Sequence, residues 1–263
     1  MPESIEIEYY RQLAVRALHR PITSVDAPDA WFLKDGLTGA ALASAVTGRR
    51  FTDARRIGKL LLLDTDGGSG PTVGLRFGMT GRLLVDGVAG ITDLQYSSMR
   101  DEPAWDRVTF HLEGGGDLRI RDPRRLGAVQ LDPDESRLGP DVLGIAPAQL
   151  RDALAGSTAP VKARLLDQAR VAGVGNLIAD EALWRAGVDP TREAGSLSPA
   201  EVRRLHRHLR ATIDELTARG GSHTGDVYGS RRPGGHCPKD GTAMVRRTVG
   251  GRTSWWCARE QTS

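Results

Sequence analysis

The hydrophobic pattern of the chain changes from short strands to helices near its midpoint. Between about residues 22 and 130, short apolar runs alternate with glycine-rich turns, as in KLLLLDTD, RVTFHLEGGGDLRIRD and GAVQLDP. Runs of this kind indicate β-strands packed as a sandwich or barrel. From 147 to 219 the apolar residues recur at helical spacing, as in NLIADEALWRAG. The order of these patterns predicts an α+β multidomain protein.

The remaining segments complete the predicted organisation. Residues 5–18 (IEIEYYRQLAVRAL) predict an N-terminal helix, and proline and acidic residues at 132–147 indicate a linker. The last part of the chain predicts a β-hairpin that turns at Val249–Gly250–Gly251. We therefore expect a β-sandwich domain at 1–131, a linker at 132–147, a helical domain at 148–222 and a hairpin at 223–263.

Composition narrows the class of protein. Of the 263 residues, 39% are hydrophobic and 26% charged, which is typical of a globular chain. No apolar run is long enough to span a membrane, and Glu3, Glu6 and Glu8 do not fit a signal peptide. We expect a cytoplasmic protein. A net charge of +3 gives a mild indication of a polyanionic partner.

Two segments could bind phosphate. In VAGVGNLIADEALW, Gly173 and Gly175 would let backbone N–H groups converge on an anion, and Asn176 could add a donor or cap the following helix. An ordinary helical hairpin is the alternative. Arg252 follows the glycine turn of the predicted β-hairpin, where its guanidinium would suit a phosphate. There the alternative is a solvated charged turn.

Three more positions stand at turns of the strand-rich part. Lys59 lies in RRIGKLLLL, Met79 in RFGMTG, and Arg124 and Leu126 in RDPRRLG. A methionine on a turn could insert between stacked bases, and an arginine with an apolar neighbour could fill the space of an extruded base. A strand-edge lysine, a core methionine and a plain turn are the corresponding alternatives.

The first residues, MPESIEIE, place a proline and two carboxylates at the N-terminus. Chain termini usually fray and have no function, so Pro2 could simply mark processing. The other interpretation is that the terminal amine itself is a reactive group.

Taken in order, these motifs resemble the formamidopyrimidine-DNA glycosylase / endonuclease VIII family of base-excision repair enzymes. The resemblance covers nearly the whole chain and rests on MPE at the start, RRIGKLLLL, GMTG, DPRRLG, LGPD, AGVGNLIADEALW and GGRTSWWC. It implies a β-sandwich domain with an N-terminal helix, a helix–two-turn–helix domain and a C-terminal finger, with or without zinc. It also implies a bifunctional DNA glycosylase and abasic-site lyase.

The resemblance assigns catalytic roles at the N-terminus. Removal of Met1 would leave Pro2 with a secondary amine that attacks C1′ of the damaged nucleotide and forms a Schiff base. Glu3 would act as general acid and Glu6 would shape the same pocket. Lys59 would hold a phosphate near the lesion.

The resemblance also assigns DNA contacts. Asn176 and Arg252 would bind the phosphates that flank the flipped nucleotide, and we add Lys162 to these DNA-binding residues. Met79, Arg124 and Leu126 would occupy the vacated place in the stack. The partner would be double-stranded DNA with damaged bases or abasic sites, bound by a monomer, in a cytoplasmic, nucleoid-associated setting.

The finger departs from the zinc-binding form of the family, which has two C-x-x-C pairs. Here the pairs read Cys237-Pro-Lys-Asp240 and Cys257-Ala-Arg-Glu260. Structural zinc sites favour thiolate and imidazole ligands, so we predict a zincless finger and no cofactor. A site made of Cys237, Asp240, Cys257 and Glu260 is the alternative.

The preferred lesion stays open. Leu126 replaces the usual phenylalanine, and the short segment from Gly220 to Cys237 argues for lesions that need no covering loop. Met79 with Arg124 instead resembles the formamidopyrimidine-type branch. A catalytically inactive paralogue that only binds damaged DNA is the competing hypothesis, which an intact Pro2, Glu3 and Lys59 disfavour. A zinc-dependent regulator is disfavoured by the missing thiolates.

Overall fold

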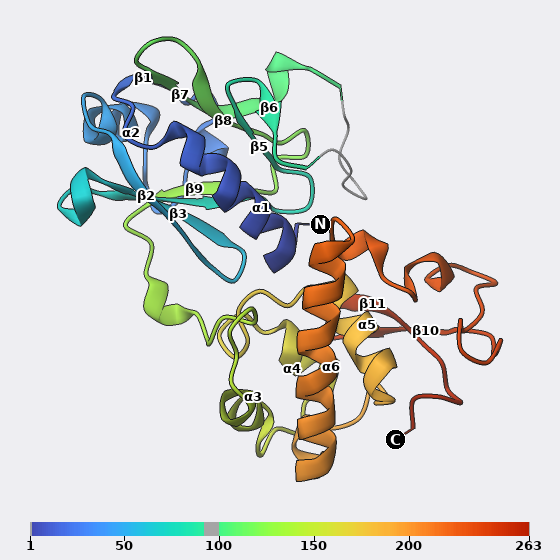
Figure 1. The fold of residues 1–263 in the computed structure, drawn as a ribbon. Helices are drawn as coiled ribbons and strands as arrows, with labels where there is room; N and C mark the ends of the chain where they lie inside the picture. Colours follow the sequence, from blue (N-terminus) through green and yellow to red (C-terminus); the bar gives the residue numbers. More distant parts are fainter. Residues whose placement is uncertain (1, 92–99, 263) are drawn as a thin grey trace. The chain divides into compact units, whose positions relative to one another are not determined.

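The computed structural model describes residues 2–91 and 100–262 (Figure 1). The chain divides into two units between Glu135 and Ser136, inside the segment that the sequence predicts as a linker. Unit 1 contains Pro2 and Glu6–Glu135; unit 2 contains Glu3–Ile5 and the residues from Ser136 onward. We describe each unit by itself.

Unit 1 is a sandwich of two antiparallel sheets, as predicted. The first sheet has the order β1-β7-β8-β5-β6 and the second the order β2-β3-β4-β9. The strands of the first sheet are β1 (Ile22–Asp26), β7 (Asp106–Leu112), β8 (Asp117–Arg121), β5 (Arg82–Val85) and β6 (Val88–Ala89). Those of the second sheet are β2 (Phe51–Ile57), β3 (Leu60–Thr65), β4 (Thr72–Arg76) and β9 (Ala128–Leu131).

Alternation along the strands builds the core of unit 1. In β7, Val108, Phe110 and Leu112 are buried while the residues between them are half-buried, so one face of the sheet points into the core. Phe110 meets Phe51 of the other sheet with ring centroids 5.4 Å apart, and both rings belong to one hydrophobic cluster. Burying side chains of this size contributes roughly 1.5–3 kcal/mol each.

Two helices belong to this core (Figure 1). α1 (Ser4–Ala14) buries Ile7, Tyr10 and Ala14 in the cluster, at the three- and four-residue spacing of one helix face. A short 3₁₀ turn, Val15–Ala17, continues it. α2 (Gly39–Val46) begins after Thr38, whose hydroxyl accepts from the Ala41 N–H at 3.1 Å.

Unit 2 contains four α-helices among the described residues, in the region where the sequence predicts them. They are α3 (Pro147–Leu154), α4 (Val161–Leu166), α5 (Asn176–Ala186) and α6 (Pro199–Ala218). α6 begins with a capping box between Ser198 and Glu201. The Arg192 guanidinium holds the pKa of Glu201 at about 2, with help from Ser198. The start of the longest helix in Figure 1 is therefore fixed by charge as well as by hydrogen bonds.

The C-terminal hairpin packs on α5. β10 (Val245–Val249) and β11 (Arg252–Trp256) pair in register around the turn Gly250–Gly251, which confirms the predicted turn. Trp184 of α5 shares a hydrophobic cluster with Val227, Cys237, Met244, Trp255 and Cys257. The predicted α+β class and its order of sandwich, helices and hairpin are confirmed. Within the described ranges, none of the helices has the length and apolarity to cross a bilayer.

Candidate functional site

Glu3 caps helix α5 from a distant part of the sequence. Its side chain is fully buried in unit 2. The carboxylate accepts hydrogen bonds from the backbone N–H groups of Gly175 (2.9 Å), Leu177 (2.8 Å) and Ile178 (3.1 Å). The first N–H groups of a helix have no partner inside the helix, and the helix dipole favours negative charge there. Glu3 therefore supplies the anion on which the N–H groups converge.

The glycine turn before α5 makes this cap possible. Gly173 has a φ of +107°, a conformation that favours glycine. Gly175 has ordinary backbone angles, but a Cβ there would lie 2.2 Å from Glu3 Cδ. The Gln168 side chain braces the turn by accepting from the Gly173 N–H at 3.0 Å and donating to the Val174 carbonyl at 3.1 Å. The turn thus leaves room for the carboxylate.

Asn176 is the first residue of α5, and the structure corrects one of its expected roles. The cap of α5 comes from Glu3, and Gly175, which has no side chain, is the N-cap residue. The Asn176 side chain is half-buried, and its Oδ1 has no hydrogen-bond partner among the described residues. Its amide is therefore not committed to the helix cap.

Arg252 stands at the start of β11, directly after the glycine turn, and is exposed. The turn rests on α4, because a Cβ on Gly250 would lie 2.8 Å from the Ala163 Cβ. Only a glycine allows the hairpin to approach the helix this closely. The position of Arg252 is therefore set by backbone packing within unit 2.

Lys162 lies in the interior of unit 2. A residue that binds DNA would have to lie at the surface, so the structure does not fit the predicted DNA-binding role of Lys162. It is fully buried, and its Nζ lies 2.6 Å from Asp180 Oδ1. It also donates to the Ser254 hydroxyl at 2.6 Å and to the Thr253 carbonyl at 3.2 Å. Burial lowers the pKa of Lys162, and the Asp180 charge opposes that shift. A buried ammonium on these partners joins α4, α5 and β11 and is not presented to a phosphate.

We expect Lys162→Met to destabilise unit 2 strongly. The change removes one partner of a buried ion pair, which costs about 3 kcal/mol of unfolding free energy. Asp180 still pairs with Arg231, whose Nη2 lies 2.9 Å from its carboxylate. The loss of unfolding free energy therefore stays near the lower end of the range for broken buried ion pairs. Tryptophan fluorescence during denaturant unfolding measures it.

The matched control is Arg151→Met, which removes the exposed pair Arg151–Asp152 of the same unit. Exposed pairs contribute little, so its midpoint should stay close to that of the unchanged chain. Equal effects of the two substitutions would contradict the structural role of Lys162.

The finger brings three potential metal ligands together. One ligand atom from each of Cys237, Asp240 and Cys257 lies within 4.8 Å of the others. Glu260 is outside this group, and its carboxylate lies 3.7 Å from Lys239 Nζ. The Trp184 indole N–H donates to Cys237 Sγ at 3.3 Å, and burial raises the pKa of the Cys257 thiol. Three donors converge where a closed zinc site requires four.

In unit 1, two turns that carry predicted residues pack against each other. Gly78 has a φ of +57°, and a Cβ on it would lie 2.4 Å from the carbonyl carbon of Leu126. Met79, next to Gly78, is half-buried, whereas Arg124 is exposed and Leu126 is 47% exposed. The structure therefore brings Met79 and Leu126 onto adjoining turns.

Asp122 organises both turns, and the sequence interpretation missed it. Its buried carboxylate accepts from the Thr80 hydroxyl on one side and from the Leu126 and Gly127 N–H groups, both at 2.8 Å, on the other. The position of Asp122 before a proline in DPRRLG could have indicated this role, because short acidic side chains often accept hydrogen bonds from backbone N–H groups in turns.

The remaining predicted residues of unit 1 lie as follows. Lys59 is half-buried in the two-residue turn between β2 and β3, after Gly58 with a φ of +58°. Glu6 is buried on α1. Burial of Tyr10 raises the pKa of its hydroxyl, and the charge of Glu6 is the second cause of that increase. Pro2 is buried, and Met1 lies outside the described residues.

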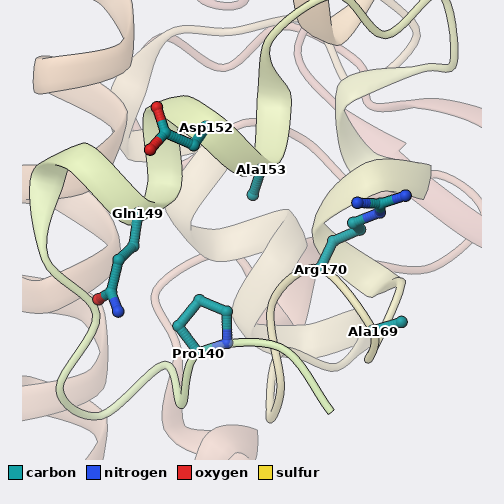
Figure 2. Close-up of a pocket in the computed structure, with 6 residues that line it drawn as sticks. All are labelled: Pro140, Gln149, Asp152, Ala153, Ala169 and Arg170. Atoms are coloured by element: carbon teal, nitrogen blue, oxygen red, sulfur yellow. The ribbon is translucent and has the colours of Figure 1, made fainter. Parts of the chain in front are cut away.

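A surface pocket of unit 2 is unrelated to these residues. Figure 2 shows Pro140 below the pocket, with Gln149 and Asp152 on one side and Arg170 on the other. None of the predicted site residues lines it. The pocket is therefore not a candidate for the site that the sequence predicts.

Comparisons with known proteins agree with this arrangement. The model of the formamidopyrimidine-DNA glycosylase N-terminal domain matches residues 1–129, and that of the glycosylase H2TH domain matches residues 138–227. The chain belongs to the formamidopyrimidine-DNA glycosylase family. Family membership makes it a DNA glycosylase of base-excision repair.

Relatives match this glycosylase over nearly its full length. The formamidopyrimidine-DNA glycosylase of Ruegeria pomeroyi is 36% identical, covering 99% of this chain and 100% of the relative. That of Paracoccus denitrificans is 37% identical, covering 98% of each. Wild-type Lactococcus lactis Fpg in complex with DNA containing N7-benzyl-Fapy-dG is 25% identical, with a TM-score of 0.81 and full coverage of both chains. The family that the sequence motifs predict is therefore confirmed.

Proposed function

We propose that this glycosylase is bifunctional and that the amine of Pro2 is its nucleophile. The proposed partner is double-stranded DNA with a damaged base or an abasic site. Complexes of structural relatives with DNA that contains Fapy-dG or an abasic site support this. The observation that carries the proposal is the burial of Glu3 on the N-terminus of α5. Because Glu3 is bonded to Pro2, this cap limits the positions open to the nucleophile.

The proposed reaction begins once Met1 has been removed. The Pro2 nitrogen, then a secondary amine, attacks C1′ as the bond from C1′ to the base breaks, and the base leaves as it gains a proton. The amine then loses its proton and the C1′–O4′ bond of the sugar opens, with Glu3 proposed as the general acid that protonates O4′. The ring-opened product is an iminium ion, which makes the C2′ proton acidic. Loss of that proton breaks the C3′–O3′ bond and releases the 3′ phosphate. Water then hydrolyses the iminium and restores the amine.

The proposed residue roles follow the two units. In unit 2, the Asn176 amide and the exposed Arg252 bind phosphates, and Glu3 holds the N-terminus. In unit 1, Lys59 binds a phosphate, Glu6 shapes the pocket, and Met79, Arg124 and Leu126 fill the space of the extruded nucleotide. The shared Asp122 carboxylate and the close approach of Gly78 to Leu126 support a joint role for the two turns.

The experiment that tests the function compares three duplexes carrying an abasic site, a formamidopyrimidine or no damage. We expect strand cleavage of the first two and none of the third. Damage-dependent binding without base release or cleavage would instead identify an inactive damage-binding paralogue. The duplex panel also ranks the lesions.

We expect Arg252→Ala to weaken binding to a duplex that contains tetrahydrofuran, a stable abasic-site analogue. Loss of one phosphate contact should reduce the slope of log K against log salt by about 0.9. Fluorescence anisotropy across a range of salt concentrations measures both effects. The control is Arg259→Ala, which changes an exposed arginine of the same unit whose guanidinium lies 3.9 Å from Asp240. Parallel salt dependences for wild type and Arg252→Ala would remove Arg252 from the interface.

We also propose that the finger folds without zinc. Its support is the donor set, since Glu260 pairs with Lys239 and Cys237 accepts the indole N–H of Trp184. Were zinc bound, Cys237, Asp240 and Cys257 would hold it, and its chemistry would be structural.

We expect a chelator to leave the melting temperature and the cleavage rate unchanged. Elemental analysis of the purified chain should find far less than one zinc per molecule. The matched variant combines Asp240→Cys with Glu260→Cys, which supplies four thiolates and should bind one zinc. A chelator-sensitive melting temperature in the unchanged chain would contradict the zincless finger.

A further inference from the structure

We infer that Trp31 of unit 1 is a further DNA-contacting residue, packing against a nucleotide beside the turn that carries Leu126. The inference rests on the proposed function, because it takes DNA to be the molecule that reaches this turn. Trp31 is 67% exposed, more than any other large hydrophobic side chain among the described residues. A single exposed apolar residue is ordinary, so exposure alone does not indicate a binding role. The inference depends on the residues around Trp31.

The Trp31 backbone is connected to the 122–127 turn through Asp29. Its N–H donates to Asp29 Oδ1 at 3.2 Å. The same carboxylate accepts from Arg125 Nε at 2.7 Å and Nη2 at 2.6 Å, and Arg125 precedes Leu126. Arg125 keeps a φ of +55° in this arrangement, which is unusual for a residue with a side chain. An ion pair therefore ties the Trp31 segment to the turn.

The residues after Trp31 strengthen this attachment. Phe32 is buried, and a Cβ on Gly127 would lie 2.7 Å from its Cζ. The Lys34 N–H then donates to the Val129 carbonyl at 3.0 Å. The segment thus runs beside residues 127–129, directly after Leu126, so Trp31 and Leu126 stand on neighbouring strips of chain. Two exposed apolar side chains are therefore carried by backbone segments that pack against each other.

The charges around Trp31 suit a polyanion. Lys34 Nζ lies 4.5 Å from the centroid of the indole ring. Asp29 is paired with Arg125 and also lies 3.5 Å from Arg107, and it is only 9% exposed. Its negative charge is therefore neutralised and withheld from the surface. An aromatic face beside a cation is the combination that proteins use to contact bases and the backbone of nucleic acids.

The test measures binding of the full chain to a fluorescent duplex with one tetrahydrofuran abasic analogue. We expect Trp31→Ala to raise Kd roughly tenfold, with the salt slope unchanged because no charge is lost. Trp31→Phe should recover most of the affinity. Val15→Ala, which truncates an exposed apolar residue elsewhere in unit 1, should bind as wild type.

A second readout guards against an effect on folding. Binding of the duplex should quench part of the tryptophan fluorescence of the wild type, and Trp31→Phe should lose that part while keeping the wild-type melting temperature. If wild type binds the damaged duplex and Trp31→Ala binds it equally well, the inference is overturned and the proposed function stands. If wild type binds an undamaged duplex of the same sequence as tightly as the tetrahydrofuran duplex, both fail.

Discussion

Gly175→Ala is expected to reduce strand cleavage at an abasic site by roughly a hundredfold, although the substitution adds one methyl group far along the chain from Pro2. The backbone angles of Gly175, φ −116° and ψ −169°, suit any residue, so the cost is not backbone strain. The new Cβ would lie 2.2 Å from Glu3 Cδ and 2.5 Å from its Oε1. The carboxylate must leave, and displacements of about 1 Å can cost a hundredfold in rate.

The same substitution should lower stability. It breaks three hydrogen bonds to a carboxylate, each worth about 1.5–3 kcal/mol before relaxation, and leaves N–H groups of α5 without a partner. Single-turnover cleavage and thermal melting measure the two effects. Gly144→Ala is the matched control, because nothing lies within 4 Å of a Cβ at that position of unit 2. Wild-type cleavage by Gly175→Ala would show that the Glu3 cap is not needed for catalysis.

Pro2→Gly is expected to lose abasic-site cleavage by roughly two orders of magnitude or more, because it replaces the proposed secondary-amine nucleophile by a primary amine whose position is not fixed. Glycine still offers an amine, but it lacks the ring that fixes the position of the nitrogen. The Glu3 cap is unchanged in this variant, so α5 and the DNA-binding residues of unit 2 should be unaffected.

Binding provides the control for that substitution. Affinity for the tetrahydrofuran duplex, which cannot form a Schiff base, should stay within about twofold of wild type, or roughly 0.4 kcal/mol. A variant that cleaves normally would remove Pro2 from the mechanism. One that no longer binds would show that the N-terminus is needed to hold the DNA, which contradicts the expected separation of binding from chemistry.

Local patterns were enough to predict the elements of the fold. Alternating residues in RVTFHLEGGGDLRIRD gave β7 and β8 on either side of three glycines, and the helical spacing in NLIADEALW gave α5. The hairpin followed from its two glycines, because both turn residues have positive φ. These features depend on residues close together in the sequence.

Long-range contacts account for what the sequence did not reveal. From the sequence, the adjacent Asn176 is one candidate for the cap of α5, but the cap comes from Glu3, more than 170 residues away. The sequence analysis places Lys162 among the DNA-binding residues, because nothing near it in the sequence indicates that Asp180 and Ser254 surround it. Asp122 likewise acts on Thr80 in another turn. Polar side chains that meet only in the folded chain leave little local signal.

The most direct test of the proposed chemistry is to trap the covalent intermediate. The purified chain is incubated with abasic-site DNA and borohydride, and the crosslinked peptide is sequenced by mass spectrometry. We predict one adduct, on the nitrogen of Pro2, in molecules that have lost Met1. An adduct on a lysine, or a chain that cleaves DNA with Met1 still attached, would contradict the account.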